Sequence, residues 1–389
     1  MADDDNPKGI KINKRRLLGI VFSAASLILF TYVAITLISG RELGLARLIR
    51  WIRPAEYIEP VDDFYFDVGR NRVFADLGDS VAAAGSLGVQ VFNKGGAETV
   101  RDPFRMSSPA LSATEGRAVA FDIGGTSVRS FTESQICASV EASGAVVSAS
   151  INRNGWFAVC TQDSGAYKSL VTVYNDTGQS AYRVSLASGY TLNAGLSPDN
   201  KKLAVLNMTD NGSKITMYDL GNEEPDGEFV YPGGLILDIR YLPGGQVLAV
   251  TMNSLVVVDK DGSGTVFFSF DGRRLGGYIL IDSLVVLHLY DFGVGYGGRL
   301  ITLDESGRLL GGVVTDRAIL SMSTCGKYLA VLKSDGPVLY DTELSEFPPL
   351  NNHEAAAGAT QVISLGDSSV LAAGDHFATV LRIGEGAEH

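Results

Sequence analysis

Histidine, cysteine and carboxylate side chains are the groups best able to carry catalysis or hold a metal, and this sequence does not cluster them. Its four histidines are His288, His353, His376 and His389. A zinc site or a histidine-based hydrolase needs histidine grouped with thiols or carboxylates. His288 lies inside an apolar run, which favours a histidine packed in a strand over a ligand. We therefore predict no catalytic residue and no metal ligand.

Two further features suggest chemistry but fit structure better. Residues 259–264 resemble the start of a calcium loop, yet Phe270 stands where such a loop requires glutamate. Cys137, Cys160 and Cys325 are three in number, so a complete set of disulfides is impossible. We expect small buried thiols in strands, and we predict no cofactor.

Binding chemistry is concentrated in three longer polar segments, at residues 161–169, 207–214 and 289–299. Tyrosine, phenylalanine and arginine suit contacts with a partner because they bury much area at modest entropy cost. Loops on a rigid scaffold also carry function more often than strands do. The candidate partner-binding residues are Asp163, Tyr167, Asp210, Asn211, Tyr290, Asp291, Phe292, Tyr296 and Arg299.

A repeated phrase indicates which scaffold presents these segments. Eight times after Pro60, a polar turn precedes a short apolar strand, as in DNKKLAVL at 199–206 and CGKYLAVL at 325–332. The strand starts are 36, 39, 46, 44, 37, 44 and 42 residues apart. A period of about 41 residues is typical of the four-stranded blades of a β-propeller. We predict an all-β, eight-bladed propeller, with seven blades as the alternative.

A second phrase, an apolar strand that runs into an Asx-containing turn, completes each unit. Examples are VTVYNDTG at 171–178 and LITLDESG at 300–307; asparagine, aspartate and glycine suit such hairpin turns. Each unit then has strands A, B, C and D, with the longer segments between B and C. The last unit ends after its third strand. We expect residues 63–68 (DFYFDV) to supply its outer strand and close the ring.

These units resemble WD-repeat and quinoprotein-type (PQQ-like) β-propellers across residues 61–384. Tyr218-Asp219 and Tyr340-Asp341 stand where a WD dipeptide would end strand C, although no true Trp-Asp pair occurs. The tryptophan-docking motif of quinoprotein enzymes is also missing. The layout resembles bacterial membrane-anchored propeller proteins of unknown function. The resemblance implies a fold and says little about activity.

Residues 17–39 (LLGIVFSAASLILFTYVAITLIS) form an uncharged run of 23 residues. A helix of this length spans about 34 Å, enough for a hydrocarbon core of about 30 Å. We predict a single transmembrane helix that acts as a signal anchor, with a cleaved signal peptide as its rival. Five basic residues precede the span and four follow it, which favours a cytoplasmic N-terminus and an extracytoplasmic propeller. The localisation predicted is the plasma membrane.

The predicted organisation has four parts. Residues 1–16 are a basic cytoplasmic tail, 17–39 the span, 40–60 a juxtamembrane amphipathic helix or simple stalk, and 61–389 the propeller. Nine basic and six acidic residues lie in 1–60, which leaves 23 basic and 38 acidic residues in the remainder. The net charge of −12 argues against a nucleic-acid partner.

Two functional hypotheses follow. In the first, a non-enzymatic, membrane-anchored propeller binds a protein or a cell-envelope component through the face that carries its B–C loops. In the alternative, a propeller-type hydrolase, lactonase-like or glycan-cleaving, uses carboxylates and a metal in the central channel. Convergent carboxylates would favour the hydrolase, and a channel lined by neutral residues would count against it. A cytoplasmic-facing scaffold is a third possibility.

Overall fold

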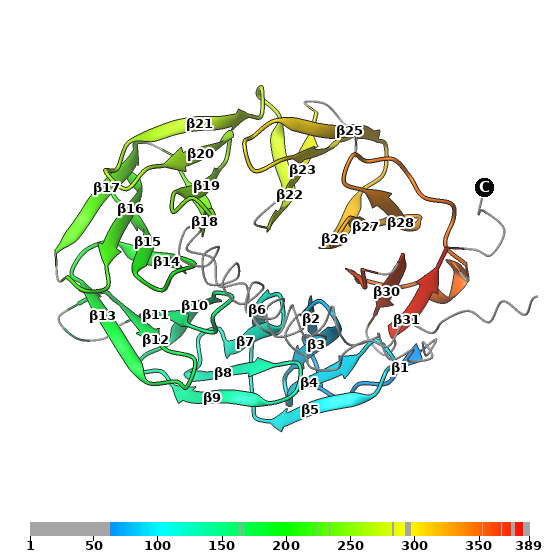
Figure 1. Ribbon diagram of the computed structural model, residues 1–389, viewed down its shortest axis with the longest axis horizontal. Coiled ribbons are helices and arrows are strands. Elements are labelled where there is room, and N and C mark those ends of the chain that lie inside the picture. The colour runs from blue at the N-terminus through cyan, green and yellow to red at the C-terminus, as the bar shows by residue number, and fades with distance from the viewer. Residues whose placement is uncertain are drawn as a thin grey trace, which may run out of the picture. The chain divides into compact units, whose positions relative to one another are not determined.

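The computed structural model describes residues 63–383, except 163, 164, 166, 223, 233, 282, 283, 292–296, 352, 367 and 375–377. The chain divides into two units, Met1–Tyr57 and Ile58–His389, and all described residues belong to the second. In this part of the chain, eight antiparallel sheets stand around a central axis, each a blade of a propeller (Figure 1). The eight-bladed prediction is therefore confirmed, and the seven-bladed alternative is wrong.

Each blade is a meander from an inner strand A to an outer strand D. The A strands are β2 (Val73–Asp76), β6 (Pro109–Thr114), β10 (Val146–Ile151), β14 (Tyr190–Leu196), β18 (Ile236–Tyr241), β22 (Arg274–Ile281), β26 (Ile319–Cys325) and β29 (Gln361–Ser364). The B strands are β3 (Ser80–Gly85), β7 (Arg117–Asp122), β11 (Phe157–Gln162), β15 (Lys202–Thr209), β19 (Val247–Thr251), β23 (Leu284–Tyr290), β27 (Tyr328–Lys333) and β30 (Ser369–Ala373). All eight repeated phrases fall on B strands.

The outer half of each blade follows the same order. The C strands are β4 (Gly88–Asn93), β8 (Ser127–Thr132), β12 (Ser169–Tyr174), β16 (Gly212–Asp219), β20 (Ser254–Val258), β24 (Gly298–Leu303), β28 (Gly336–Asp341) and β31 (Ala378–Arg382). The D strands are β5 (Glu98–Pro103), β9 (Ile136–Glu141), β13 (Ser180–Leu186), β17 (Pro225–Pro232), β21 (Gly264–Ser269), β25 (Leu309–Thr315) and, for blade 8, β1 (Asp63–Phe64).

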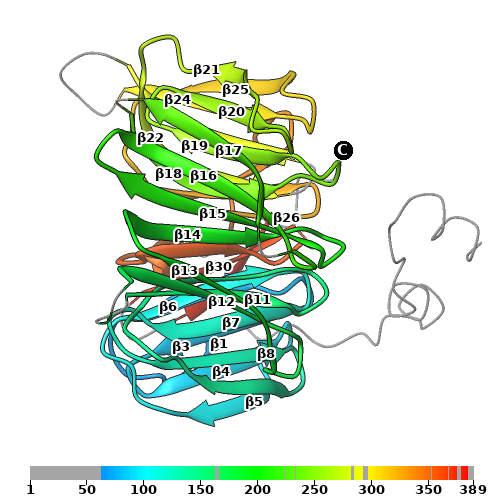
Figure 2. The same ribbon diagram turned by 90° about the vertical axis from the view of Figure 1, so that its left-hand side faces the viewer.

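The B strands form the core because both of their faces are covered by neighbouring blades. Val247–Thr251 and Ser369–Ala373 are buried at every position, as expected for short, continuous apolar strands. D strands alternate instead, as Pro225–Pro232 does, because one of their faces meets solvent. Figure 2 shows the blades stacked side by side, so each core cluster is shared by two adjacent sheets.

Asx side chains fix the turns that follow strand C. Asp341 Oδ1 accepts hydrogen bonds from the backbone N–H groups of Glu343 (2.9 Å) and Ser345 (2.8 Å). Asn175 Oδ1 does the same for Thr177 (3.1 Å) and Gln179 (2.8 Å). A short acceptor side chain can satisfy turn donors in this way, which explains why an acidic or amide residue ends strand C where a WD dipeptide would.

The ring closes as predicted from the sequence. Asp63 of β1 pairs with Thr379 of β31, so the start of the described chain supplies the outer strand of blade 8. Val68, which follows β1, is 1% exposed and packs with Val380 of blade 8 and Val81 of blade 1. This arrangement joins the first and last blades through one core cluster and removes two free sheet edges.

Blade 7 has three strands among the described residues, a difference from the expected four. The segment after β28 covers part of its outer edge instead. The N–H of Phe347 donates to the carbonyl of Leu339 (2.9 Å), and Leu344 and Leu350 are buried. Pro337 lies on the same edge, where a missing N–H discourages pairing. The segment then enters a short 3₁₀ helix, His353–Ala356, in the alanine-rich stretch.

The predicted membrane span at 17–39 lies outside the described residues, as do the tail and the juxtamembrane segment. Within the described part of the chain, no helix is long and apolar enough to cross a membrane.

Candidate functional site

The blade topology sends the B–C turns and the D–A connections to the same end of every sheet. We call this end the B–C face, and the end with the A–B and C–D turns the A–B face. The described members of the predicted set all lie at the B–C face: Tyr167, Asp210, Asn211, Tyr290, Asp291 and Arg299. Asp163, Phe292 and Tyr296 lie outside the described residues.

The structure does not gather these residues at one point. Tyr167 belongs to blade 3, Asp210 and Asn211 to blade 4, and the other three to blade 6. The segment 207–214, expected to be a longer loop, is a two-residue hairpin, because β15 and β16 pair as far as Thr209 and Gly212. Asp210 and Asn211 form the tip of that hairpin.

On blade 6, Tyr290 is held by contacts inside the blade. Its ring centroid lies 4.4 Å from that of His288, and the guanidinium carbon of Arg274 lies over the tyrosine ring, 5.4 Å from the same centroid. Gly276 makes room for this group, since an added Cβ would lie 2.5 Å from a ring carbon of Tyr290. Asp291 accepts a 2.8 Å bond from Arg273. This half-buried tyrosine is therefore a structural element of the rim.

His288 is a buried strand histidine, as the apolar run around it predicts. It is 1% exposed, and burial lowers the pKa of its imidazole. Its Nε2 has no hydrogen-bond partner among the described residues. No group of three or more His, Cys, Asp or Glu residues in the described part of the chain could hold a metal ion.

Blades 3 to 5 present a more open surface. Lys168 Nζ lies 5.2 Å over the ring of Tyr190, which joins the B–C loop of blade 3 to the first strand of blade 4. Tyr190 pairs with Met208 on the next strand. Beside Met208, a hollow is lined by Asp210, Asn211, Gly234, Leu235 and their neighbours. The predicted residues of blade 4 thus border a continuous surface that spans two blades.

Exposed apolar side chains are concentrated on the B–C face. Twelve large hydrophobic residues of the described chain are exposed, and seven of them lie at B–C turns or at the starts of A strands. We call these seven the apolar rim: Leu87, Ile123, Tyr167, Tyr190, Met208, Met252 and Leu320. The other five are Tyr65 and four residues of D strands, at the circumference.

Of the apolar rim, Tyr167 is among the residues predicted from the sequence, and the other six members are not. The available signal was an apolar residue within a short B–C turn, as at Met252 between Thr251 and Asn253. Alternation alone assigns such a residue to a strand and leaves its exposure open. The A–B face differs in character, since Asp219 and Asp341 end C strands there and Asp304 directly follows one.

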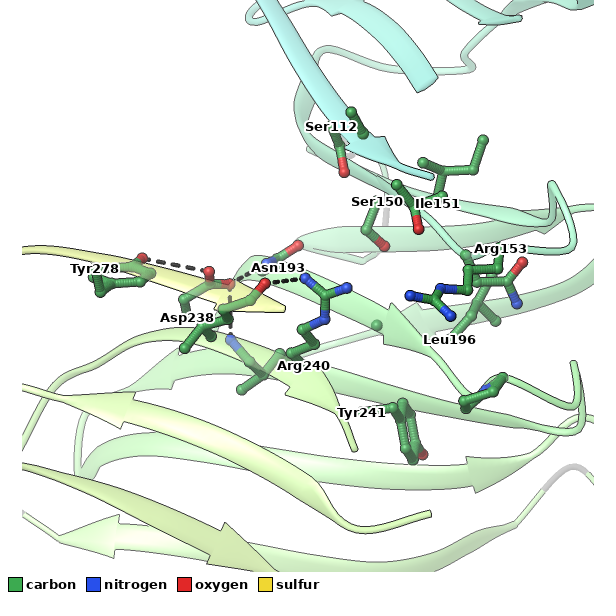
Figure 3. A pocket seen from close by; sticks show the side chains of 17 residues that line it. Ser112, Ser150, Ile151, Arg153, Asn193, Leu196, Asp238, Arg240, Tyr241 and Tyr278 are labelled. Atoms are coloured by element: carbon green, nitrogen blue, oxygen red, sulfur yellow. Dashed lines mark hydrogen bonds between the residues drawn. The ribbon is translucent and has the colours of Figure 1, made fainter. Parts of the chain in front are cut away.

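The central channel contains the second notable group of polar residues. Five A strands, β6, β10, β14, β18 and β22, surround a cavity of about 350 Å³ (Figure 3). Asp238 Oδ1 accepts bonds from Asn193 Nδ2 (2.6 Å) and from the N–H of Ile239 (2.8 Å), while Tyr278 O–H donates to Oδ2 at 3.4 Å. Burial raises the pKa of Asp238, and these three donors oppose the rise.

Asp238 is the one carboxylate on the wall of this cavity among the described residues. A hydrolytic metal centre in the channel requires several convergent carboxylates or histidines. The cavity wall instead carries hydroxyl, amide and guanidinium groups, such as those of Ser150, Asn193 and Arg240. The hydrolase alternative therefore gains no support from the channel.

The meander blades, the closure through β1 and β31 and the Asx-capped turns define an eight-bladed β-propeller built from WD-like repeats. Residues 65–273, just over half of the chain, match the model described as "Family of unknown function (DUF5711)", and the chain belongs to this family. A search of curated proteins finds no match.

Solved structures of other propellers are similar in fold. The C-terminal WD40 domain of Sif2 is 12% identical with a TM-score of 0.52, over 84% of this chain and 97% of that one. BamB from Moraxella catarrhalis is 15% identical with a TM-score of 0.49, over 85% and 99% of the two chains. At such low identity the likeness shows the fold alone.

Proposed function

We propose that this protein is a non-enzymatic interaction module that binds a protein or cell-envelope partner through the apolar rim of its B–C face. The observation that carries the proposal is the placement of seven of the twelve exposed large hydrophobic side chains on that face. Scattered exposed hydrophobic residues are ordinary, but a gathering on one face marks an interaction surface.

The composition of the rim supports a protein partner. Tyr167, Tyr190, Met208 and Met252 belong to residue types enriched in the cores of protein interfaces. Lys168 and Asp210 border them and would supply the polar margin of such an interface. The predicted residues Tyr290, Asp291 and Arg299 extend the same face over blade 6, and we retain them in the proposal.

The proposal includes membrane attachment through residues 17–39, with a cytoplasmic N-terminus and an extracytoplasmic propeller. The uncharged run of 23 residues supports the anchor, and the surplus of basic residues before it supports the orientation. The propeller side of the chain, with 38 acidic and 23 basic residues, would be repelled by anionic lipid. Its B–C face would thus stay available to a partner.

A paired substitution tests the binding face. Tyr190→Ser with Met208→Ser removes two rim side chains that are 53% and 43% exposed. The matched control, Val266→Ser with Leu309→Ser, removes two D-strand side chains that are 62% and 55% exposed and lie toward the A–B face. We expect chemical cross-linking in cells to lose partner capture by about tenfold in the rim variant only, since interface anchors contribute more than about 1 kcal/mol each. Equal capture by both variants would exclude the rim as the binding surface.

A separate experiment tests the orientation. Glu305 is exposed in a C–D turn, away from the rim, and Glu305→Cys introduces a thiol there. In intact cells, a membrane-impermeant maleimide should label this variant above the level of the unsubstituted chain. Labelling only after cell lysis would place the propeller in the cytoplasm, the third possibility.

A further inference from the structure

We infer that Asn211, at the tip of the blade 4 hairpin, is a site of non-enzymatic deamidation that converts its carboxamide into a carboxylate. Asn211 is followed by Gly212, and the sequence has one other Asn-Gly pair, Asn154-Gly155. The reaction needs water as its only co-reactant. The modification itself does not depend on the function proposed for the B–C face.

The reaction is an intramolecular acyl transfer followed by hydrolysis. The backbone nitrogen of Gly212 attacks the side-chain carbonyl carbon of Asn211 and loses its proton, and the carboxamide nitrogen leaves as ammonia. Water then opens the resulting succinimide at either of its carbonyl carbons, which gives aspartate or isoaspartate. Glycine favours the first step because it has no Cβ to obstruct the approach of its nitrogen.

The carboxamide of Asn211 is accessible and unrestrained. The residue is exposed, and no described residue hydrogen-bonds its side chain. Its backbone N–H donates to Thr209 Oγ1 (3.3 Å), so the main chain holds the turn while the side chain can rotate. The hollow beside Met208 is lined by both Asn211 and Gly212, which gives water access to the reacting atoms.

The hairpin requires glycine after Asn211 and places its nitrogen at the end of a ladder. Gly212 has a φ of 112°, a value that residues with a side chain rarely adopt. Gly212 and Thr209 form the last pair of the β15–β16 ladder. The ends of such ladders open at a small cost in free energy. Opening there releases the nitrogen of Gly212 for the attack.

Asn154-Gly155 has the same two residues in surroundings that oppose the reaction. Asn154 Nδ2 donates to the carbonyl of Pro198 at 2.7 Å and to Asn200 Oδ1 at 3.3 Å, which holds the carboxamide in its A–B turn. The N–H of Gly155 donates to the carbonyl of Asn152 (3.0 Å), and Gly155 is buried. Both reacting groups are engaged, so this pair is an internal control.

The product alters the surface that the proposed function assigns to a partner, and this consequence rests on that function. Deamidation places a second carboxylate beside Asp210, close to the exposed Met208. A charge that loses its water in an apolar interface weakens that interface. In the cross-linking assay, Asn211→Asp, which reproduces the product, should capture several-fold less partner than Asn211→Gln. Equal capture by these two variants would refute the consequence, and the modification is measured separately.

Peptide mapping by mass spectrometry tests the modification on the purified full-length chain in detergent, incubated for weeks at mildly alkaline pH. Trypsin should release Asn211 in the peptide 203–214 and Asn154 in the peptide 154–168. In the folded chain we expect the acid form to accumulate at Asn211 at least about tenfold faster than at Asn154, because Asn154 reacts only after a larger local opening. In guanidinium chloride the two rates should agree within about threefold, since unfolding removes the protection of Asn154. Equal rates in the folded chain, or no acid form at Asn211, would overturn the inference.

Asn211→Gln locates the reaction. Glutamine keeps the carboxamide, but its extra methylene requires a larger ring, which forms much more slowly. Because the side chain of Asn211 is exposed and makes no hydrogen bond to a described residue, this variant should fold as the wild type does. The acid form of peptide 203–214 should disappear in the variant. An acid form that persists would place the reaction at Asn207, in the same peptide, and refute the site.

Discussion

Asp76 offers the most direct test of how this propeller handles a buried charge. It ends β2, and its Oδ1 accepts a 2.9 Å bond from the N–H of Gly78. Burial raises the pKa of Asp76 from 3.8 to about 6, against the opposing effects of Gly78, the Cys325 thiol and the Lys94 ammonium. Cys325 comes from blade 7, so this carboxyl lies at the junction where the ring closes.

The sign of the pH effect follows from the raised pKa. Between pH 3.8 and about 6 the folded protein binds a proton that the unfolded chain releases, so the free energy of unfolding falls as pH rises through this window. At 1.36 kcal/mol per pH unit, the ionised carboxylate costs about 3 kcal/mol at pH 7.5 and about 0.6 kcal/mol at pH 4. Solvent screening of a partly exposed group reduces the difference to about 2 kcal/mol.

Asp76→Asn removes the titration while it keeps the size of the side chain and the oxygen that Gly78 contacts. Urea unfolding at pH 4 and pH 7.5 should show the variant gaining about 2 kcal/mol relative to the wild type at the higher pH. Asp316→Asn is the control, because Asp316 is an exposed aspartate in the connection between β25 and β26 and is not among the groups that act on Asp76. Its difference from the wild type should be within about 0.5 kcal/mol at both pH values.

Two results would refute this reasoning. If the difference between Asp76→Asn and the wild type is equal at both pH values, the carboxyl titrates alike in the folded and unfolded chains. If Asp76→Asn is instead less stable at pH 7.5, the attraction of Lys94 and the bond from Gly78 outweigh the cost of burial.

Two further predictions concern packing and turns. Gly276→Ala places a Cβ 2.5 Å from the ring of Tyr290 and should cost about 1–3 kcal/mol in urea unfolding, whereas Gly244→Ala, with no atom within 4 Å, should cost much less. Asp341→Ala removes the acceptor for two backbone N–H groups of the turn that follows strand C in blade 7. It should lower the free energy of unfolding by about 1 kcal/mol, with Asp341→Asn restoring most of the loss.

The sequence predicted the repeat well because the blades share one local chemistry. An apolar B strand after a polar turn, and an Asx residue at the end of strand C, recur in nearly every unit, so spacing alone located them. The outer edge of blade 7 was not predicted, because the segment that covers it after β28 is irregular. In place of a D strand, Phe347 donates its backbone N–H to the carbonyl of Leu339. No periodic sequence pattern predicts such a bond.

Candidate sites were harder to predict because their members come from different blades. Asn193 and Asp238 are 45 residues apart, about one repeat, and the packing of blade 4 against blade 5 brings their side chains within 2.6 Å. Tyr190 and Met208 show the other difficulty, since their alternation is that of buried strand residues although both are exposed. The sequence pattern predicts which strand residues are apolar. Whether solvent reaches such a residue depends on how close it lies to the end of its sheet.

The residues of the central channel show why an alignment of the eight repeats does not reveal candidate functional positions. Asn193, Asp238 and Tyr278 pair with Leu206, Val250 and Leu287, which hold the same place in successive B strands. On the B strands the residue type is conserved from blade to blade, so the core repeats. On the A strands the same place changes from amide to carboxylate to phenol, and the amide of Asn193 and the hydroxyl of Tyr278 both donate to the carboxylate of Asp238. Residues that differ at equivalent places of this ring are therefore the ones to substitute first in any search for its ligand.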